Sequence, residues 1–101
     1  MKSMAYKVVV SPRVQKEVEN AIDYYALYST NAPAAFIARL NEAYSALAVN
    51  PFFGLRYKNI RSLKLNTFPY SLFYTVNEQQ NIVRVLSCFH NKRDPDHRPG
   101  Y

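Results

Sequence analysis

Residues 70–95 have the sequence YSLFYTVNEQQNIVRVLSCFHNKRDP, in which apolar and more polar side chains alternate along most of the stretch. A period of two is typical of strands that bury one face. The alternation extends upstream, so we expect a three-strand meander formed by residues 60–66, 69–77 and 82–90. Pro95 cannot continue a ladder of backbone hydrogen bonds, which leaves the charged residues that follow the last strand at the rim of the sheet.

Two turns determine which side chains share a face of this meander. A turn at Gln79 and Gln80 pairs Asn77 with Ile82, Thr75 with Arg84, Phe73 with Leu86 and Ser71 with Cys88. A turn at residues 66–69 pairs Leu65 with Tyr70 and Leu63 with Leu72. The predicted core face then carries Arg61, Leu63, Leu65, Tyr70, Leu72, Tyr74, Val76, Val83, Val85, Ser87 and Phe89. The predicted working face carries Ser62, Lys64, Ser71, Phe73, Thr75, Arg84, Leu86, Cys88 and His90. A slip of one residue would exchange the two sets.

The remaining elements follow from helical periodicity. Alternation at residues 6–10 predicts a first strand, and Ser11 and Pro12 suit the cap and first position of a helix. Apolar side chains then recur at three- and four-residue spacing over residues 12–29 and 32–49, with Thr30 or Asn31 as the second cap. We expect residues 51–59 to form a loop. The predicted fold is α+β and two-layered: an N-terminal strand, then an antiparallel helical hairpin packed on one face of an antiparallel sheet that the meander completes.

Length and charge restrict the class of protein. A chain of 101 residues forms one domain, with residues 91–101 expected as an extended tail. The net charge is +6, and residues 56–101 carry eight Lys and Arg against three Asp and Glu. This excess favours an acidic partner, either nucleic acid or an acidic protein segment, and less plausibly a membrane surface.

Other features exclude several kinds of site. Cys88 is the only cysteine, so no internal disulfide can form and a reducing cytoplasm is the expected location. No apolar run is long enough for a signal peptide or a membrane span. Two histidines and one cysteine give no metal-ligand spacing, and two glycines give no phosphate-binding loop, so we expect neither a metal nor a cofactor.

The candidate chemistry lies on the polar side of the sheet. Lys64, Arg84 and His90 occupy the predicted working face, and Lys92, Arg93 and Arg98 follow at the rim. RNA cleavage through the 2′-hydroxyl needs cations that stabilise the charged phosphorane and a proton-transfer group such as histidine. The same cations also suit simple electrostatic docking, and each could equally be an ordinary solvated residue.

The order of elements, with Tyr70-Ser71-Leu72-Phe73-Tyr74 and the ending Phe89-His90-Asn91-Lys92-Arg93-Asp94-Pro95, resembles the RelE/ParE superfamily of bacterial toxins. The resemblance is greatest to the ParE-like branch, often labelled plasmid stabilisation proteins. It implies the toxin of a type II toxin–antitoxin pair, neutralised by a cognate antitoxin whose acidic or amphipathic segment wraps around it. Lys64, Arg84, Lys92, Arg93 and Arg98 are the residues that we expect to bind the antitoxin or the target.

The branches of this superfamily differ in mechanism. RelE-like ribosome-dependent mRNA endonucleases carry lysines on the first meander strand, an arginine after the tyrosine that opens the second, and an arginine beyond the last. Here Lys64 matches one lysine, but Ser62 and Ser71 occupy two other positions, and Asn91 aligns with the final arginine unless Arg93 is shifted by two residues. We therefore expect inhibition of DNA gyrase or a related topoisomerase by protein binding. The alternatives are an endonuclease using His90, Lys64 and Arg84, and a non-toxic module that only binds a partner.

Overall fold

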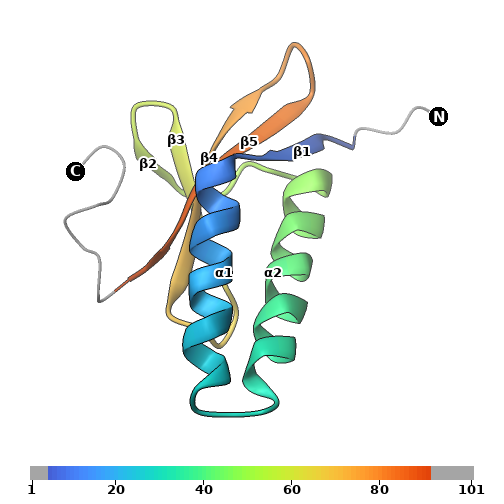
Figure 1. The fold of residues 1–101 in the computed structure, drawn as a ribbon. Helices are drawn as coiled ribbons and strands as arrows, with labels where there is room; N and C mark the ends of the chain where they lie inside the picture. Colours follow the sequence, from blue (N-terminus) through green and yellow to red (C-terminus); the bar gives the residue numbers. More distant parts are fainter. Residues whose placement is uncertain (1–4, 92–101) are drawn as a thin grey trace.

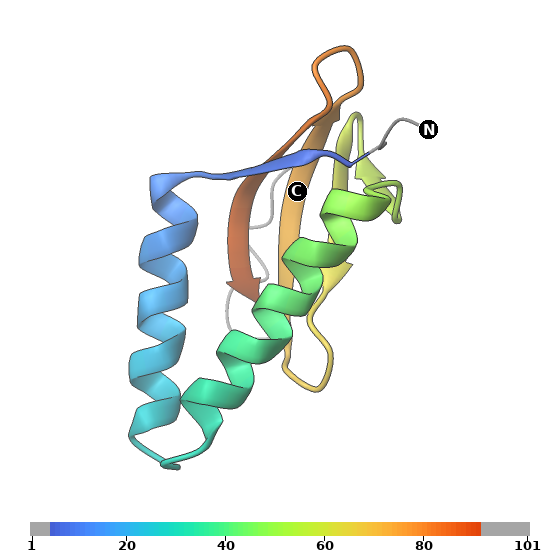
Figure 2. The same cartoon turned by 90° about the vertical axis from the view of Figure 1, so that its right-hand side faces the viewer.

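The computed structural model describes residues 5–91, in which two helices form one layer and a five-stranded sheet forms the other (Figure 1 and Figure 2). The elements are β1 (Lys7–Val10), α1 (Pro12–Ala26), α2 (Ala32–Val49), β2 (Leu55–Tyr57), β3 (Ile60–Lys64), β4 (Tyr70–Asn77) and β5 (Ile82–His90). The strands lie in the order β1-β5-β4-β3-β2. The predicted α+β class, helical hairpin and meander are confirmed. Within these residues, no helix is both long and apolar enough to cross a bilayer.

Three details of the predicted elements are wrong. β1 pairs with β5 in parallel, so the sheet is mixed, and alternation cannot reveal this because parallel and antiparallel strands share the same period. β2 lies within the predicted loop 51–59, where three residues are too few to show a period. α1 ends at Ala26 rather than Ser29, and the next three residues form a hydrogen-bonded turn.

The predicted N-terminal cap is confirmed for α1 but not for α2. The Val14 N–H donates to the Ser11 hydroxyl over 3.3 Å, and Pro12 occupies the first turn of α1, as predicted. Asn31 occupies the capping position of α2 but its side chain makes no capping hydrogen bond. The Ser29 hydroxyl instead accepts from the N–H groups of Asn31 and Ala32, at 3.1 and 3.2 Å.

The helices cover the predicted core face of the meander. Near both turns the pairs are as predicted: Asn77 lies opposite Ile82, and the Leu65 N–H donates to the Tyr70 carbonyl over 2.8 Å. The predicted pairs of Phe73 with Leu86 and of Ser71 with Cys88 are wrong, because Phe73 lies opposite Ser87 and Ser71 opposite Phe89. One buried cluster joins the two layers and contains Val14, Ala21, Phe36, Leu40, Ala43, Leu47, Leu65, Tyr70, Leu72, Tyr74, Val83, Val85 and Cys88. Lys64 and Arg84 therefore lie on the sheet face opposite the helices.

A β-bulge in β5 changes the face assignment beyond Val85. Tyr74 pairs with Val85 but Phe73 pairs with Ser87, so Leu86 has no partner in β4. An extra residue reverses the alternation that follows it. The predicted core position of Phe89 and the predicted working-face positions of Cys88 and His90 are therefore wrong. Ser87 lies opposite Phe73 in register, but it is fully buried and its hydroxyl bonds to Glu17 of α1. Cys88 joins the core, and Phe89 stacks on Phe73 with ring centroids 4.5 Å apart.

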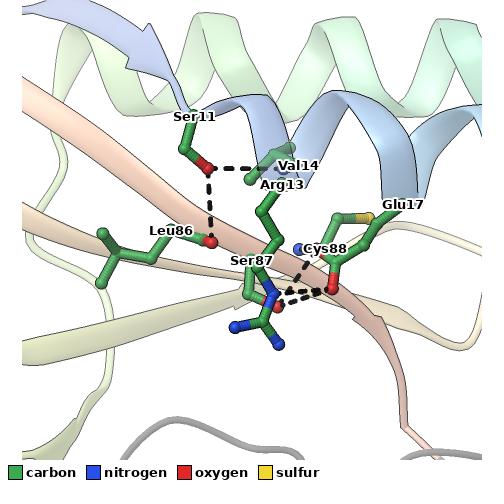
Figure 3. A network of polar contacts seen from close by, with 7 residues as sticks. All are labelled: Ser11, Arg13, Val14, Glu17, Leu86, Ser87 and Cys88. Atoms are coloured by element: carbon green, nitrogen blue, oxygen red, sulfur yellow. Dashed lines mark hydrogen bonds and ion pairs between the residues drawn. The ribbon is translucent and has the colours of Figure 1, made fainter.

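Glu17 joins α1 to the second half of β5 (Figure 3). β1 ends opposite Val85, so within residues 5–91 no strand lies beside the next residues of β5 on that side. The Glu17 carboxylate accepts from the Cys88 N–H at 2.8 Å and from the Ser87 hydroxyl at 3.3 Å, and it pairs with Arg13 at 3.1 Å. The helix thus satisfies a backbone donor that a neighbouring strand would otherwise bind.

Tyr74 fixes the segment between α2 and β2. Its ring is fully buried, its hydroxyl donates to the Pro51 carbonyl at 2.8 Å, and it accepts from the Phe53 N–H at 3.3 Å. Burial raises the pKa of Tyr74, whereas the Phe53 hydrogen bond and Arg61 lower it. Arg61 also donates to the Phe53 carbonyl over 2.6 Å. The loop is held by two polar side chains of the sheet.

We expect Tyr74→Phe to destabilise the fold by about 1–3 kcal/mol, because it leaves a buried carbonyl and a buried N–H without a partner. The measurement is urea unfolding followed by circular dichroism. Tyr57→Phe is the matched control, since Tyr57 is 45% exposed, and it should change the free energy of unfolding by less than about 0.5 kcal/mol. Equal stability of the two variants would contradict the structural role of Tyr74.

We expect Cys88 to be unreactive in the folded chain. The residue is 1% exposed, and burial, together with the charge of Glu17, raises the pKa of its thiol to about 12. Because the thiolate is the nucleophile, alkylation by iodoacetamide at pH 8 should be at least about a hundredfold slower in buffer than in 8 M urea. Mass spectrometry of timed samples measures both rates, and rapid labelling of folded protein would refute the assignment of Cys88 to the core.

Candidate functional site

We call the sheet face opposite the helices the outer face. It carries Lys64 and Arg84, the two cations that were predicted for the working face. By register it includes Ser62, Lys64, Ser71, Phe73, Thr75, Arg84 and Phe89. Phe73 lies in its middle beside Ser62, whereas Phe89 lies in the same cross-strand row as Ser71 and Lys64, and both rings are almost fully buried. The two cations, Lys64 and Arg84, lie towards opposite ends of the face.

Arg84 lies at the end near the β4–β5 turn. It is exposed and pairs across the sheet with Thr75. An open polar hollow of about 410 Å³ adjoins it, lined also by Asn59, Asn77, Glu78 and Gln80. A guanidinium can bind carboxylates or phosphates. Arg84 therefore offers one point where an acidic group can dock, and the Glu78 carboxylate in the same lining opposes a second negative charge.

Lys64 lies at the opposite end of the outer face. Its ammonium group is 3.4 Å from the Leu65 carbonyl and 3.3 Å from the Phe68 carbonyl, so it donates to the turn before β4. Lys64 pairs with Ser71 and Arg84 with Thr75, four residues and two strand spacings apart. Standard strand geometry separates their Cα atoms by roughly 16 Å. The two cations share a face but not a site.

Ser71 and Asn91 form a neutral pair beside Lys64. The Ser71 hydroxyl donates to the Asn91 side-chain carbonyl over 2.9 Å, and the Asn91 N–H donates to the Pro69 carbonyl over 2.8 Å. In the resemblance to the nuclease branch, Ser71 and Asn91 each align with an arginine. The alignment does not indicate that the two side chains are in contact. The structure brings them together without a positive charge.

His90 is not beside Lys64 and Arg84. Because of the bulge it pairs with Tyr70, whose ring belongs to the helix-side core, and the two ring centroids lie 5.0 Å apart. The predicted working-face trio is therefore not assembled. Lys92, Arg93 and Arg98 lie outside the described residues.

A second hollow opens among α1, α2 and β1. Its volume is about 360 Å³, and its lining includes Val10, Val18, Leu40 and Tyr44. Burial is the main cause that raises the pKa of Tyr44 to about 12, and the neighbouring Cys88 adds to it. No single stretch of sequence predicts this apolar groove, because three separate elements build it. Its one sequence signal is that apolar residues occur on the helix flanks as well as on the core-facing stripes.

Residues 5–91 contain few of the side-chain groupings that catalytic or metal sites need. In residues 5–91 no three His, Cys, Asp or Glu side chains gather in a way that could hold a metal ion. What the geometry provides is a polar hollow with Arg84, an apolar groove on the helix side and a single lysine at the far rim. Such surfaces are suited to binding another macromolecule.

Several solved structures share this fold. The solved structure of the chromosomal ParDE system from P. aeruginosa matches with a TM-score of 0.71 at 16% identity, covering 87% of this chain and 98% of that one. The RelBE2 toxin–antitoxin complex from Mycobacterium tuberculosis matches with a TM-score of 0.59 at 18% identity, covering 88% and 94%. The isolated E. coli RelE toxin matches with a TM-score of 0.55 at 18% identity, covering 92% of each chain.

These likenesses establish the fold, and the sequence establishes the family. No curated protein matches the chain in sequence. The model of the ParE toxin of the type II toxin–antitoxin system parDE, however, matches residues 8–95, which is most of the chain. The chain therefore belongs to the ParE toxin family of type II toxin–antitoxin systems.

Proposed function

We propose that this toxin inhibits DNA gyrase or a related topoisomerase by binding to it. The observation that carries the proposal is the ParE family match together with the neutral Ser71–Asn91 pair where the nuclease branch is positively charged. A phosphorane must be stabilised by cations that surround it. Among residues 5–91, Lys64 is the one cation at that position, and it already donates to two turn carbonyls.

The placement of His90 also supports binding rather than cleavage. A general acid or base must reach the atom whose proton it transfers. His90 packs on Tyr70 on the helix side, whereas Lys64 and Arg84 lie on the outer face. An endonuclease would need these groups around one phosphate, so we rank ribosome-dependent mRNA cleavage second.

We propose a cognate antitoxin as the first partner. We also propose that the toxin acts in the cytoplasm. Structures similar to this chain include ParDE and RelBE toxin–antitoxin systems. The apolar groove that includes Val18 and Leu40 could receive apolar side chains, and the hollow beside Arg84 could receive a carboxylate. Opposite charge between two surfaces accelerates encounter and selects the partner.

The antitoxin proposal predicts a charge-dependent complex. Arg84→Glu should weaken binding of the protein encoded by the adjacent gene by roughly three- to tenfold, mainly through slower association. Lys16→Glu is the matched control, because Lys16 is exposed on α1, whereas Arg13 is unsuitable since it pairs with Glu17. Surface plasmon resonance at two salt concentrations measures both rates. Equal affinities of the two variants would exclude Arg84 from the interface.

The gyrase proposal predicts that His90→Gln remains toxic. A nuclease that lost its acid or base would lose roughly 10² to 10⁴ in rate, but a protein that acts by binding would not. Cells expressing the wild type without antitoxin should show DNA-damage signalling and arrested replication. Thermal melting of purified His90→Gln checks that the variant is folded.

Two results would change this conclusion. Codon-phased cuts in ribosome-bound mRNA that vanish with folded His90→Gln would establish the endonuclease. Normal growth of cells expressing folded wild type would favour a module that only binds its partner.

A further inference from the structure

The turn between α1 and α2 stands apart from the rest of this basic chain because it has no charge. Between Asp23 and Arg39 there are fifteen residues, 24–38, without a single Asp, Glu, Lys, Arg or His. The chain as a whole has 13 Lys and Arg and seven Asp and Glu. Both views show this turn extending beyond the β3–β4 turn, at the opposite end of the molecule from the β4–β5 turn (Figure 1 and Figure 2).

Large apolar side chains are exposed on this turn. We call Tyr24, Leu27, Tyr28 and Ile37 the tip patch; they are 38%, 77%, 73% and 41% exposed. Apolar surface gathered at a projecting end is characteristic of a surface that binds another protein. Tyrosine is also enriched among the residues that contribute most to interface affinity.

The tip patch is held in a defined conformation. The Leu27 N–H donates to the Tyr24 carbonyl at 3.2 Å, and the Tyr28 and Ser29 N–H groups donate to the Tyr25 carbonyl at 3.1 Å. The rings of Tyr24 and Tyr28 lie 5.1 Å apart, and Tyr25 connects them to the core through Phe36 at 5.7 Å. A rigid anchor loses little entropy on binding, so its apolar surface contributes more fully to affinity.

The size and charge of the tip patch indicate its partner. A stable interface needs about 800 Å² from each protein, and a fully covered tyrosine supplies only about 150–250 Å². Four side chains that are already partly covered can therefore be only the anchor of a larger contact with any partner. A second copy of the chain is disfavoured, because two copies with a net charge of +6 repel each other. The antitoxin contacts proposed above, the apolar groove with Val18 and Leu40 and the hollow beside Arg84, are lined by other residues than those of the tip patch.

We propose that the tip patch inserts into an uncharged apolar pocket of the protein that this toxin inhibits. The inference rests on the proposed inhibition of a topoisomerase by binding, and it assigns the contact to Leu27 and Tyr28 at the end of the helical hairpin. The Tyr28 hydroxyl provides one polar group that can bond at the mouth of the pocket. The antitoxin and the target then use different parts of the toxin surface.

Leu27→Glu and Tyr28→Glu test this inference, because each places a charge where an apolar pocket would have to desolvate it. Val49→Glu is the matched control: Val49 is 74% exposed and ends α2, as Leu27 follows the end of α1. The measurements are binding to purified DNA gyrase, inhibition of supercoiling, binding to the antitoxin and thermal melting. We expect the two tip variants to lose at least about tenfold in gyrase affinity. Val49→Glu should bind normally, and all three variants should keep antitoxin binding and fold.

Each other outcome has a distinct meaning. If wild type binds gyrase and folded Leu27→Glu and Tyr28→Glu bind equally well, the tip contact is refuted while gyrase inhibition stands. Loss of antitoxin binding alone in the tip variants would assign the patch to the antitoxin and refute the inference. If wild type neither binds nor inhibits gyrase, the proposed function fails, and the inference that depends on it fails too.

Discussion

The extra residue in β5, Leu86, determines which side chains of this sheet can act together. Up to Val85 the strand follows strict alternation and packs against the helices. Beyond the bulge the faces exchange, so Cys88 enters the core and His90 lies against Tyr70. A single insertion in the register therefore removes the one histidine of the strand from the face that bears Lys64 and Arg84. It also increases local twist, which turns the end of β5 away from the line of its first half.

The bulge coincides with the point where β5 loses its strand neighbour. Val10 is the last residue of β1 to pair with it, and from there α1 runs along its edge. Ser11 connects the two regions, since its N–H donates to the Val85 carbonyl and its hydroxyl lies 3.5 Å from the Leu86 carbonyl. Glu17, two turns further on, accepts from the Cys88 N–H. A helix with one carboxylate thus protects an edge that would otherwise be open to another chain.

The periodicity of apolar side chains predicts the helices and strands, because each extends over several repeats. It does not predict the β-bulge, which depends on a single inserted residue. Both helices, the meander and the paired turns follow from repeats of several residues. The bulge does not, because residues 85–89 offer apolar side chains in either register: Val85 and Phe89 in one, Leu86 and Cys88 in the other. The shared face of Lys64 and Arg84 was predictable, whereas the contact between Ser71 and Asn91 required the register of β5 to be known.

The distribution of charge divides the toxin into two kinds of surface. Residues 56–101 hold five of the six net positive charges, so their attraction acts at a distance and weakens with salt. Residues 24–38 hold no charge, so contact there depends on apolar burial and on a close fit. A partner that binds the charged residues of 56–101 associates faster. A partner that binds residues 24–38 is selected by the fit of its shape. Because the residues of the tip patch differ from those that line the hollow beside Arg84 and the apolar groove, substitutions could alter antitoxin choice and target choice independently.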